Sequence, residues 1–281
     1  MTRRDLIAAR TASWRLKPEL ALTTVEEIDD FVDAMGMCVQ VPKAGVALPS
    51  LAQALIGRET VPSQSKGILK EILSSFWEKA FSKRRFIEAP VLWHTPIVLS
   101  KNMFTLFYTV LKSRRIDRAP LPRTSRLQRE VIEFIAHHKV ATRKQIREFI
   151  SANRRAPGAT QESLDRALLT LWSQLDIIRT GFIHGEGMLW QATLSWDRSI
   201  KQRARRFSRQ EALKKIVEQF IITTIATTRR HLKRTFRSVA LPQEIDTAIN
   251  DLLLQGTIKV DPELIIGGKR ALVASDLRAR G

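Results

Sequence analysis

Hydrophobic residues recur with helical spacing in two stretches of the chain that match each other. The apolar positions 131, 132, 135 and 136 superpose on positions 212, 213, 216 and 217 at an offset of 81 residues. This i, i+1, i+4, i+5 spacing is that of one face of a helix. A short break and a second, basic helix follow each stretch, opened by a threonine cap at Thr142 and at Thr228. The offset is 86 there and returns to 81 after a loop insertion over residues 152–158. The chain therefore contains an internal repeat.

The third element of each copy is again helical, over residues 161–171 and 243–252. Two short apolar stretches follow in each copy, with glycines between them near Gly185 and near Gly267. Three helices and a hairpin predict a winged helix-turn-helix. We therefore expect one winged-helix domain in residues 120–200 and a second in residues 205–281.

The first part of the chain has a different pattern. Residues 24–36 predict an amphipathic helix with a threonine cap, a glutamate near the third position and a glycine stop. An apolar stretch over residues 37–41 ends at Pro42. Further helices are expected over residues 48–57, 66–81 and 102–112, with a hairpin over residues 84–100. Residues 1–115 are thus predicted to form a helical or winged-helix-like domain. The predicted fold class is mainly α with small β-hairpins (α+β), arranged as tandem winged helix-turn-helix domains.

The charge of the chain indicates which kind of partner it binds. The 281 residues include 47 Lys and Arg against 28 Asp and Glu, a net charge of +19. Such an excess favours a polyanion, and double-stranded DNA, damaged or intact, is the expected partner. Residues 201–237 hold 12 of the cations and only two acids. The third helices are acidic or neutral, with Asp165 in one and Asp246 in the other. Contacts to phosphates are therefore expected in preference to reading of base edges.

The cations expected to face DNA lie on the two second helices, on the segment between the repeats and on the second hairpin. They are Arg143, Lys144, Arg203, Arg205, Arg206, Arg229, Arg230, Lys233, Arg234, Lys269 and Arg270. A further basic block over residues 112–123 carries two prolines and is read as a linker that lies along a DNA backbone. The alternative for such units is a pure protein-interaction module, which has no need of this charge.

Several other classes of protein are disfavoured. One cysteine, Cys38, excludes an intramolecular disulfide framework and a cysteine zinc site, and the five histidines show no helical zinc motif. No glycine-rich phosphate loop precedes a helix, and we expect neither a metal nor a cofactor. The first residues lack the apolar core of a signal peptide, and no apolar run approaches a membrane span. A cytoplasmic, nucleoid-associated protein without a membrane partner is expected. Trp14 is either packed or exposed for stacking on a base.

The stretch from Phe31 to Gln40, followed by tandem winged helices, resembles the winged-helix DNA glycosylases of the interstrand-crosslink repair type, the AlkZ/YcaQ group. In that family a Gln, an apolar residue and then a Gln or Asp act on a water that displaces an alkylated purine. The resemblance makes Gln40 the candidate catalytic residue, with Val41 in the middle position. Pro42 stands where the second polar residue belongs, and proline offers neither a side-chain acceptor nor an N–H.

The resulting hypothesis is a DNA-binding tandem winged-helix protein that holds the phosphate backbone and whose base excision is impaired by Pro42. One alternative is an active DNA glycosylase that excises alkylated purines or unhooks crosslinks. Another is a non-enzymatic transcriptional or chromosomal DNA binder. For Gln40 itself, the alternative to catalysis is a buried structural amide.

Overall fold

The computed structural model describes residues 1–61, 67, 74, 86–113, 125–152, 160–183 and 185–275. Within them, α-helices predominate and short antiparallel strands form small sheets, which agrees with the predicted α+β class. The described strands form three sheets of one layout, β1-β3-β2, β4-β6-β5 and β7-β9-β8. In each sheet the second strand of a hairpin lies in the middle, between the first hairpin strand and a short strand from earlier in the chain. We call the corresponding parts the first, middle and C-terminal units.

The first unit leads through short helices into a hairpin and a long buried helix. Its elements are α1 (Arg3–Ser13), η1 (Pro18–Leu20), α2 (Val25–Met35), β1 (Met37–Cys38), α3 (Leu51–Ile56), β2 (Phe86–Leu92), β3 (Thr95–Ser100) and α5 (Lys101–Ser113). The signals predicted for α2 are confirmed: Thr24 and Glu27 form a capping box, and the helix ends at Gly36 with φ of 70°. A Cβ at Gly36 would also lie 2.8 Å from Gln219 of α11, so the close approach requires glycine. The helix expected over residues 66–81 falls outside the described residues, apart from positions 67 and 74.

The other two units contain helices and hairpins where the repeat predicts them. The middle unit comprises α6 (Arg126–His138), β4 (Val140–Thr142), α7 (Arg143–Ala152), α8 (Gln161–Ser173), β5 (Ile177–Ile183) and β6 (Gly187–Ala192). Short helices α9 (Thr193–Trp196) and α10 (Ile200–Ala204) lead on. The C-terminal unit comprises α11 (Arg209–Thr224), β7 (Ala226–Thr227), α12 (Arg229–Phe236), α13 (Pro242–Leu254), β8 (Ile258–Ile266) and β9 (Lys269–Ala274). The hairpin turns fall at Gly185 and at Gly267–Gly268, all with positive φ.

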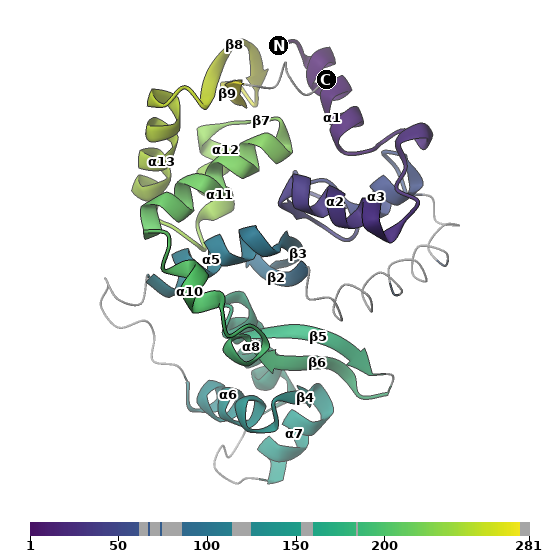
Figure 1. The fold of residues 1–281 in the computed structure, drawn as a ribbon, viewed down its shortest axis with the longest axis vertical. Helices are drawn as coiled ribbons and strands as arrows, with labels where there is room; N and C mark the ends of the chain where they lie inside the picture. The colour runs from purple at the N-terminus through teal and green to yellow at the C-terminus, as the bar shows by residue number, and fades with distance from the viewer. Residues whose placement is uncertain are drawn as a thin grey trace.

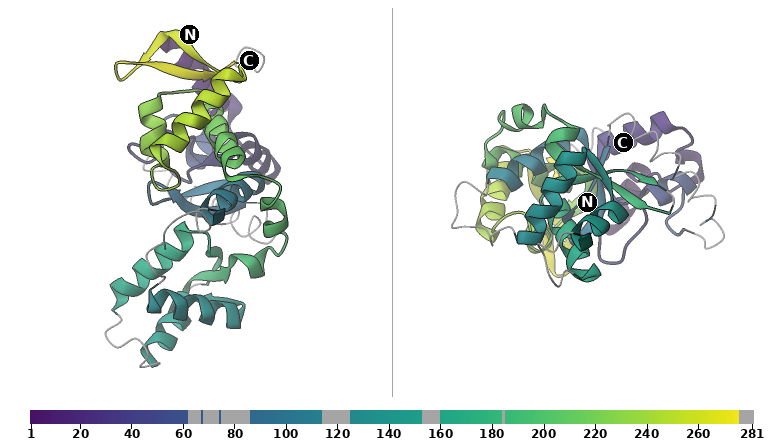
Figure 2. Two further views of the ribbon diagram at one scale, coloured as in Figure 1. Left: turned by 90° about the vertical axis from the view of Figure 1, so that its left-hand side faces the viewer. Right: turned by 90° about the horizontal axis from the view of Figure 1, so that it is seen from below.

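The units differ in how far each one has a hydrophobic core of its own. The middle unit buries its own core, in which Val131, Ile135 and Ile146 meet Trp172. The core of the C-terminal unit is continuous with that of the first unit, so that Phe104 of α5 belongs to the same buried cluster as residues of α11 and α12. Figures 1 and 2 show the middle unit at one end of the molecule, with α11 lying over α5 at its centre.

Hydrogen bonds and an ion pair connect two pairs of segments that are distant in sequence. Arg10 of α1 donates from Nε and Nη2 to the Thr224 carbonyl, at 3.1 and 3.0 Å, and Trp14 donates from Nε1 to the Thr223 carbonyl at 2.8 Å. Both carbonyls belong to the last turn of α11, where helix carbonyls lack helical partners. Lys112 lies at the end of α5 and pairs with Asp176 at 2.6 Å. Lys112 is therefore not a free linker cation as expected; residues 114–124 of that block lie outside the described residues.

Candidate nucleic-acid interface

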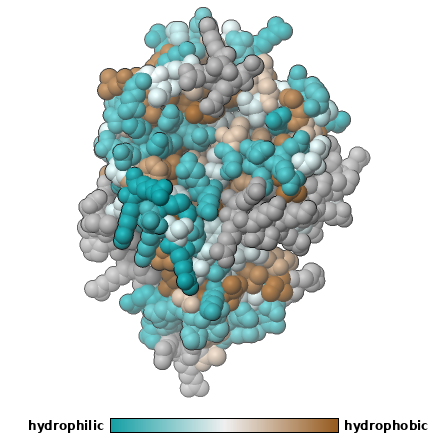
Figure 3. Space-filling view, in the orientation of Figure 1, coloured by the Kyte–Doolittle hydropathy of each residue, from teal (hydrophilic) through white to brown (hydrophobic). Residues whose placement is uncertain are grey.

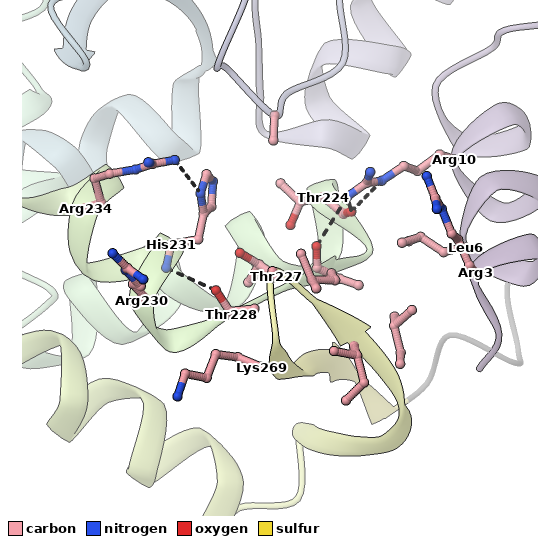
Figure 4. A pocket seen from close by; sticks show the side chains of 16 residues that line it. Arg3, Leu6, Arg10, Thr224, Thr227, Thr228, Arg230, His231, Arg234 and Lys269 are labelled. Atoms are coloured by element: carbon pink, nitrogen blue, oxygen red, sulfur yellow. Dashed lines mark hydrogen bonds between the residues drawn. The ribbon is translucent and has the colours of Figure 1, made fainter.

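An open groove of about 770 Å³ runs between α1 and the C-terminal unit. Figure 4 shows α12 on one side of it, α1 on the other and the β8–β9 hairpin beneath. The cationic side chains that line it come from these three elements: Arg3, Arg10, Arg230, Arg234 and Lys269. The groove therefore concentrates positive charge on facing walls.

The local sequence of α12 explains how its cations reach the groove. Leu232 and Phe236 are fully buried one turn apart and anchor one face of the helix. Arg230 and Arg234, spaced by the same four residues, lie on an exposed face. Thr228 caps the helix by accepting from the His231 N–H at 3.2 Å. Within the described residues neither arginine forms an ion pair with an acid, so both remain available to an anion.

The neighbouring cations of α12 are engaged inside the protein. Arg229 lies 3.6 Å from Asp246 and donates to the Asn250 side chain at 2.7 Å, and Lys233 pairs with Asp246 at 2.6 Å. The middle unit repeats this arrangement, since Arg143 pairs with Asp165 at 2.6 Å. The acids of the third helices thus hold cations that sequence analysis assigned to DNA.

The remaining predicted cations divide between exposed and engaged positions. Lys144 is exposed beside a smaller groove of about 410 Å³ that Arg143, Arg147 and the Gly185–Gly187 turn also line. Lys269 and Arg270 are exposed at the second hairpin.

The predicted cations between the repeats lie in α10 and directly after it. Arg203 is half-buried and pairs with Asp197 at 2.6 Å, while it also donates to the Thr105 hydroxyl. Arg205 and Arg206 are exposed. Figure 3 shows strongly hydrophilic side chains gathered over the α10 region. This segment therefore presents charge on the surface, although Arg203 is held internally.

His231 is the titratable group of the main groove. It is half-buried, and burial followed by the nearby charges of Arg234 and Arg10 lowers its pKa below the ordinary value of 6.5. The imidazole is accordingly neutral at pH 7 in the free protein. A bound anion would oppose both of the cationic effects and favour its protonation.

Gln40 lies away from the main groove, at the contact between the first and middle units. Its Nε2 donates to Oε1 of Glu88 at 2.8 Å, and Oε2 of Glu88 accepts from Arg179 at 3.1 Å. Gln40 is half-buried and is not among the residues that line the groove. The side-chain amide is therefore engaged by a protein carboxylate, while Val41 beside it is exposed.

Glu88 and Arg179 are the two polar residues that sequence analysis missed at this contact. Glu88 is 6 % exposed, and burial raises its pKa against the opposing effect of Arg179. The Arg179 guanidinium lies 3.7 Å from the ring centre of Trp172, whose indole N–H donates to the Glu88 carbonyl at 2.8 Å. A lone acid inside the apolar strand Phe86–Leu92 was the available signal for Glu88.

Other chemical candidates are placed in structural roles. Cys38 is fully buried, and burial raises its thiol pKa, which suits a core residue. Trp14 is half-buried and bonded to α11 as described, so the packed alternative describes it. In the described ranges, no group of His, Cys, Asp and Glu is suited to hold a metal ion. No helix among these residues is both long and apolar enough to cross a membrane.

Comparison with solved structures finds a similar fold in a DNA glycosylase. The chain aligns with Streptomyces sahachiroi DNA glycosylase AlkZ at a TM-score of 0.59 and 12% sequence identity, covering 97% of this chain and 71% of that one. At this identity the likeness shows a common fold. Comparison with protein-family profiles finds no match, and comparison with curated proteins finds none.

Proposed function

We propose that this chain is a DNA-binding protein that holds the phosphate backbone of double-stranded DNA in the groove between α1 and the C-terminal unit. Each of the middle and C-terminal units acts as a winged helix-turn-helix, and base excision is slow or absent. The observation that carries the proposal is the pair of unneutralised arginines on α12, Arg230 and Arg234, which face Arg3 and Arg10 across the groove. The fold shared with a DNA glycosylase supports DNA as the polyanion.

Acidic residues on the third helices argue against reading of bases there. In many helix-turn-helix proteins the helix that follows the turn enters the major groove. Here Asp165 and Asp246 would meet phosphates unless they kept their cationic partners, Arg143 and Lys233. With those pairs kept, and with Arg166 of α8 paired to Glu162, α8 and α13 have no spare positive charge. The affinity we expect therefore comes from the backbone and varies little with sequence.

The salt dependence of DNA binding tests this proposal. Replacing Arg230, Arg234 and Lys269 with Ala should reduce the slope of log affinity against log salt by about 0.9 for each lost phosphate contact. Arg229→Ala with Lys233→Ala is the matched control, because these cations of the same helix are paired with Asp246. Fluorescence anisotropy with several duplex sequences provides the measurement. An unchanged slope in the triple variant, or an equal loss in the control, would contradict the proposed groove.

The proposal of slow excision rests on the contacts of Gln40. A group that positions the attacking water must be directed at the substrate, whereas the Gln40 amide donates to buried Glu88. Pro42 adds no second polar group. Loss of one electrostatic group from an active site commonly costs about 100- to 1000-fold in rate.

Excision is tested with wild type and Gln40→Ala on duplexes that carry a stable alkylated purine or a labile cationic one. We expect no detectable release of the stable adduct by either protein. Release of the labile purine at equal rates by both proteins would show that Gln40 has no catalytic role. Rapid release by wild type alone would favour the alternative function, an active glycosylase that excises alkylated purines.

A further inference from the structure

A second hollow lies in the middle unit, between α8 and the β5–β6 hairpin, apart from the groove described above. Its volume is about 460 Å³, within the range of clefts that take small ligands, about 300–1,000 Å³. Most of its wall is apolar or aromatic, formed by Leu168, Leu169, Trp172, Phe182, Met188 and Trp190. This composition suits a flat, apolar group.

Phe182 is the exposed ring of this hollow. Phe182 lies on β5 and is 60 % exposed, and Leu169, which lines the same hollow, is 40 % exposed. Among the described residues Phe182 has no ring contact with another aromatic side chain, whereas Trp172 and Trp190 pack edge to face at 5.5 Å. One aromatic face at the mouth of the hollow is therefore free to stack.

The positive charge nearest the hollow comes from the adjoining groove, because Arg143 and Arg179 of the hollow itself are paired with Asp165, which also lines it, and with Glu88. Arg143 and Gly187 line both this hollow and the adjoining groove of about 410 Å³, which also carries Lys144 and Arg147. Arg179 lies inside the hollow, over the Trp172 ring. A cationic groove beside an exposed aromatic face is the arrangement that binds a phosphate and stacks the base attached to it.

We propose that this hollow receives one unpaired nucleobase of the bound DNA, stacked on Phe182, while the flanking phosphates lie along Lys144 and Arg147. The inference rests on the proposed DNA binding and adds a preference for DNA in which a base is already unpaired. Such a base costs less to place outside the stack than a paired one.

The test compares the full chain on a perfect duplex and on the same duplex with one extra, unpaired adenine. Wild type should bind the bulged duplex more tightly, and Phe182→Ala should weaken that binding by at least about fivefold, the lower end expected for stacking one base. Phe182→Ala should leave perfect-duplex binding unchanged. The matched control is Ile183→Ala: Ile183 is 41 % exposed but, as the next residue of the strand, points to the opposite face of the hairpin. It should retain the preference.

The outcomes separate this inference from the proposed function. Equal affinity of wild type for the two duplexes, or the same loss in both alanine variants, would overturn the base-binding hollow and leave DNA binding intact. Absence of binding to either duplex would overturn both proposals. Replacement of the unpaired adenine by 2-aminopurine adds a direct signal, because stacking on Phe182 should quench its fluorescence in wild type and Ile183→Ala only.

Discussion

The middle and C-terminal units have the same order of elements, but they reach stability differently. The middle unit encloses a hydrophobic core of its own, from Val131 to Ala192. The C-terminal unit shares one core with the first unit, through α5 and α11. One repeat thus keeps most of its core to itself and adds only Leu175 and Ile178 to the shared core, while the other has become half of a larger body. Similar sequence patterns therefore do not imply similar independence, because the pattern does not tell which buried face meets another unit.

The largest expected effect comes from separating the units. A fragment of residues 120–200 should unfold cooperatively, since most of its core is internal. A fragment of residues 205–281 should not, because the face of α11 that packs on α5 would be exposed to water at a cost of about 25 cal/mol per Å² of apolar surface. Urea unfolding followed by circular dichroism compares the two fragments with the full chain. Equally sharp transitions in both fragments would show that the shared core is dispensable.

Single substitutions in the two cores should also distinguish the shared core from the core of the middle unit. Phe220→Ala removes a fully buried ring from the shared core, and we expect a loss of about 3–5 kcal/mol in the free energy of unfolding. Ile135→Ala in the middle unit should cost about 2–5 kcal/mol.

The two substitutions should differ in which strands lose protection from hydrogen exchange. Hydrogen exchange in β2 and β3 of the first unit should accelerate in Phe220→Ala and stay unchanged in Ile135→Ala. Faster exchange of those strands in both variants would mean that the three units unfold together.

The smallest expected effect concerns pH and the C-terminal unit alone. The pKa of His231 is lowered in the free protein, and phosphates in the groove would raise it, so binding takes up a proton. DNA affinity should therefore rise as the pH falls below about 6.5, by up to about tenfold for each unit by which DNA raises the pKa.

His231→Gln should abolish this rise, whereas His137→Gln, at an exposed position of α6 in the middle unit, should preserve it. The lowered pKa also has the opposite consequence for folding: its contribution to stability is present above pH 6.5 and lost as the pH falls. Affinity is therefore compared where circular dichroism shows the fold intact. An unchanged pH profile in His231→Gln would assign the effect to another group.

Caps, stops and hydrophobic spacing along the sequence predicted most helices and strands. The partners of the candidate site residues depend on contacts between segments that are distant in sequence. The helix after Thr24 and its stop at Gly36 were predictable, because caps and stops act within a few residues. The helix α1 was not predicted, and it is held through Arg10 and Trp14 by carbonyls of α11. Gln40 could be singled out by resemblance, yet its partner Glu88 lies 48 residues away and Arg179 follows 91 residues later. Periodicity does not tell which charges meet across such separations.

The same limit applies to the basic helix α12. Its sequence shows four cations within one short helix, and nothing in the pattern distinguishes Arg230 from Arg229. The distinction arises because Asp246 of α13 packs beside one face of α12 and neutralises Arg229 and Lys233. Local charge density therefore does not reveal that two of the four cations are paired with an acid of the next helix.

The contact between α1 and α11 has a consequence for the order of events during synthesis. Arg10 and the Thr224 carbonyl to which it donates are separated by 214 residues. The residues of one wall of the main groove are therefore synthesised long before those of the other. The middle unit can close its core as soon as it leaves the ribosome. The first unit can form the smaller cluster around Phe31 by itself, but α1 lacks the carbonyls of α11 that hold Arg10 and Trp14 until α11 is made. The nascent chain therefore completes the main groove last, when the C-terminal unit joins α1.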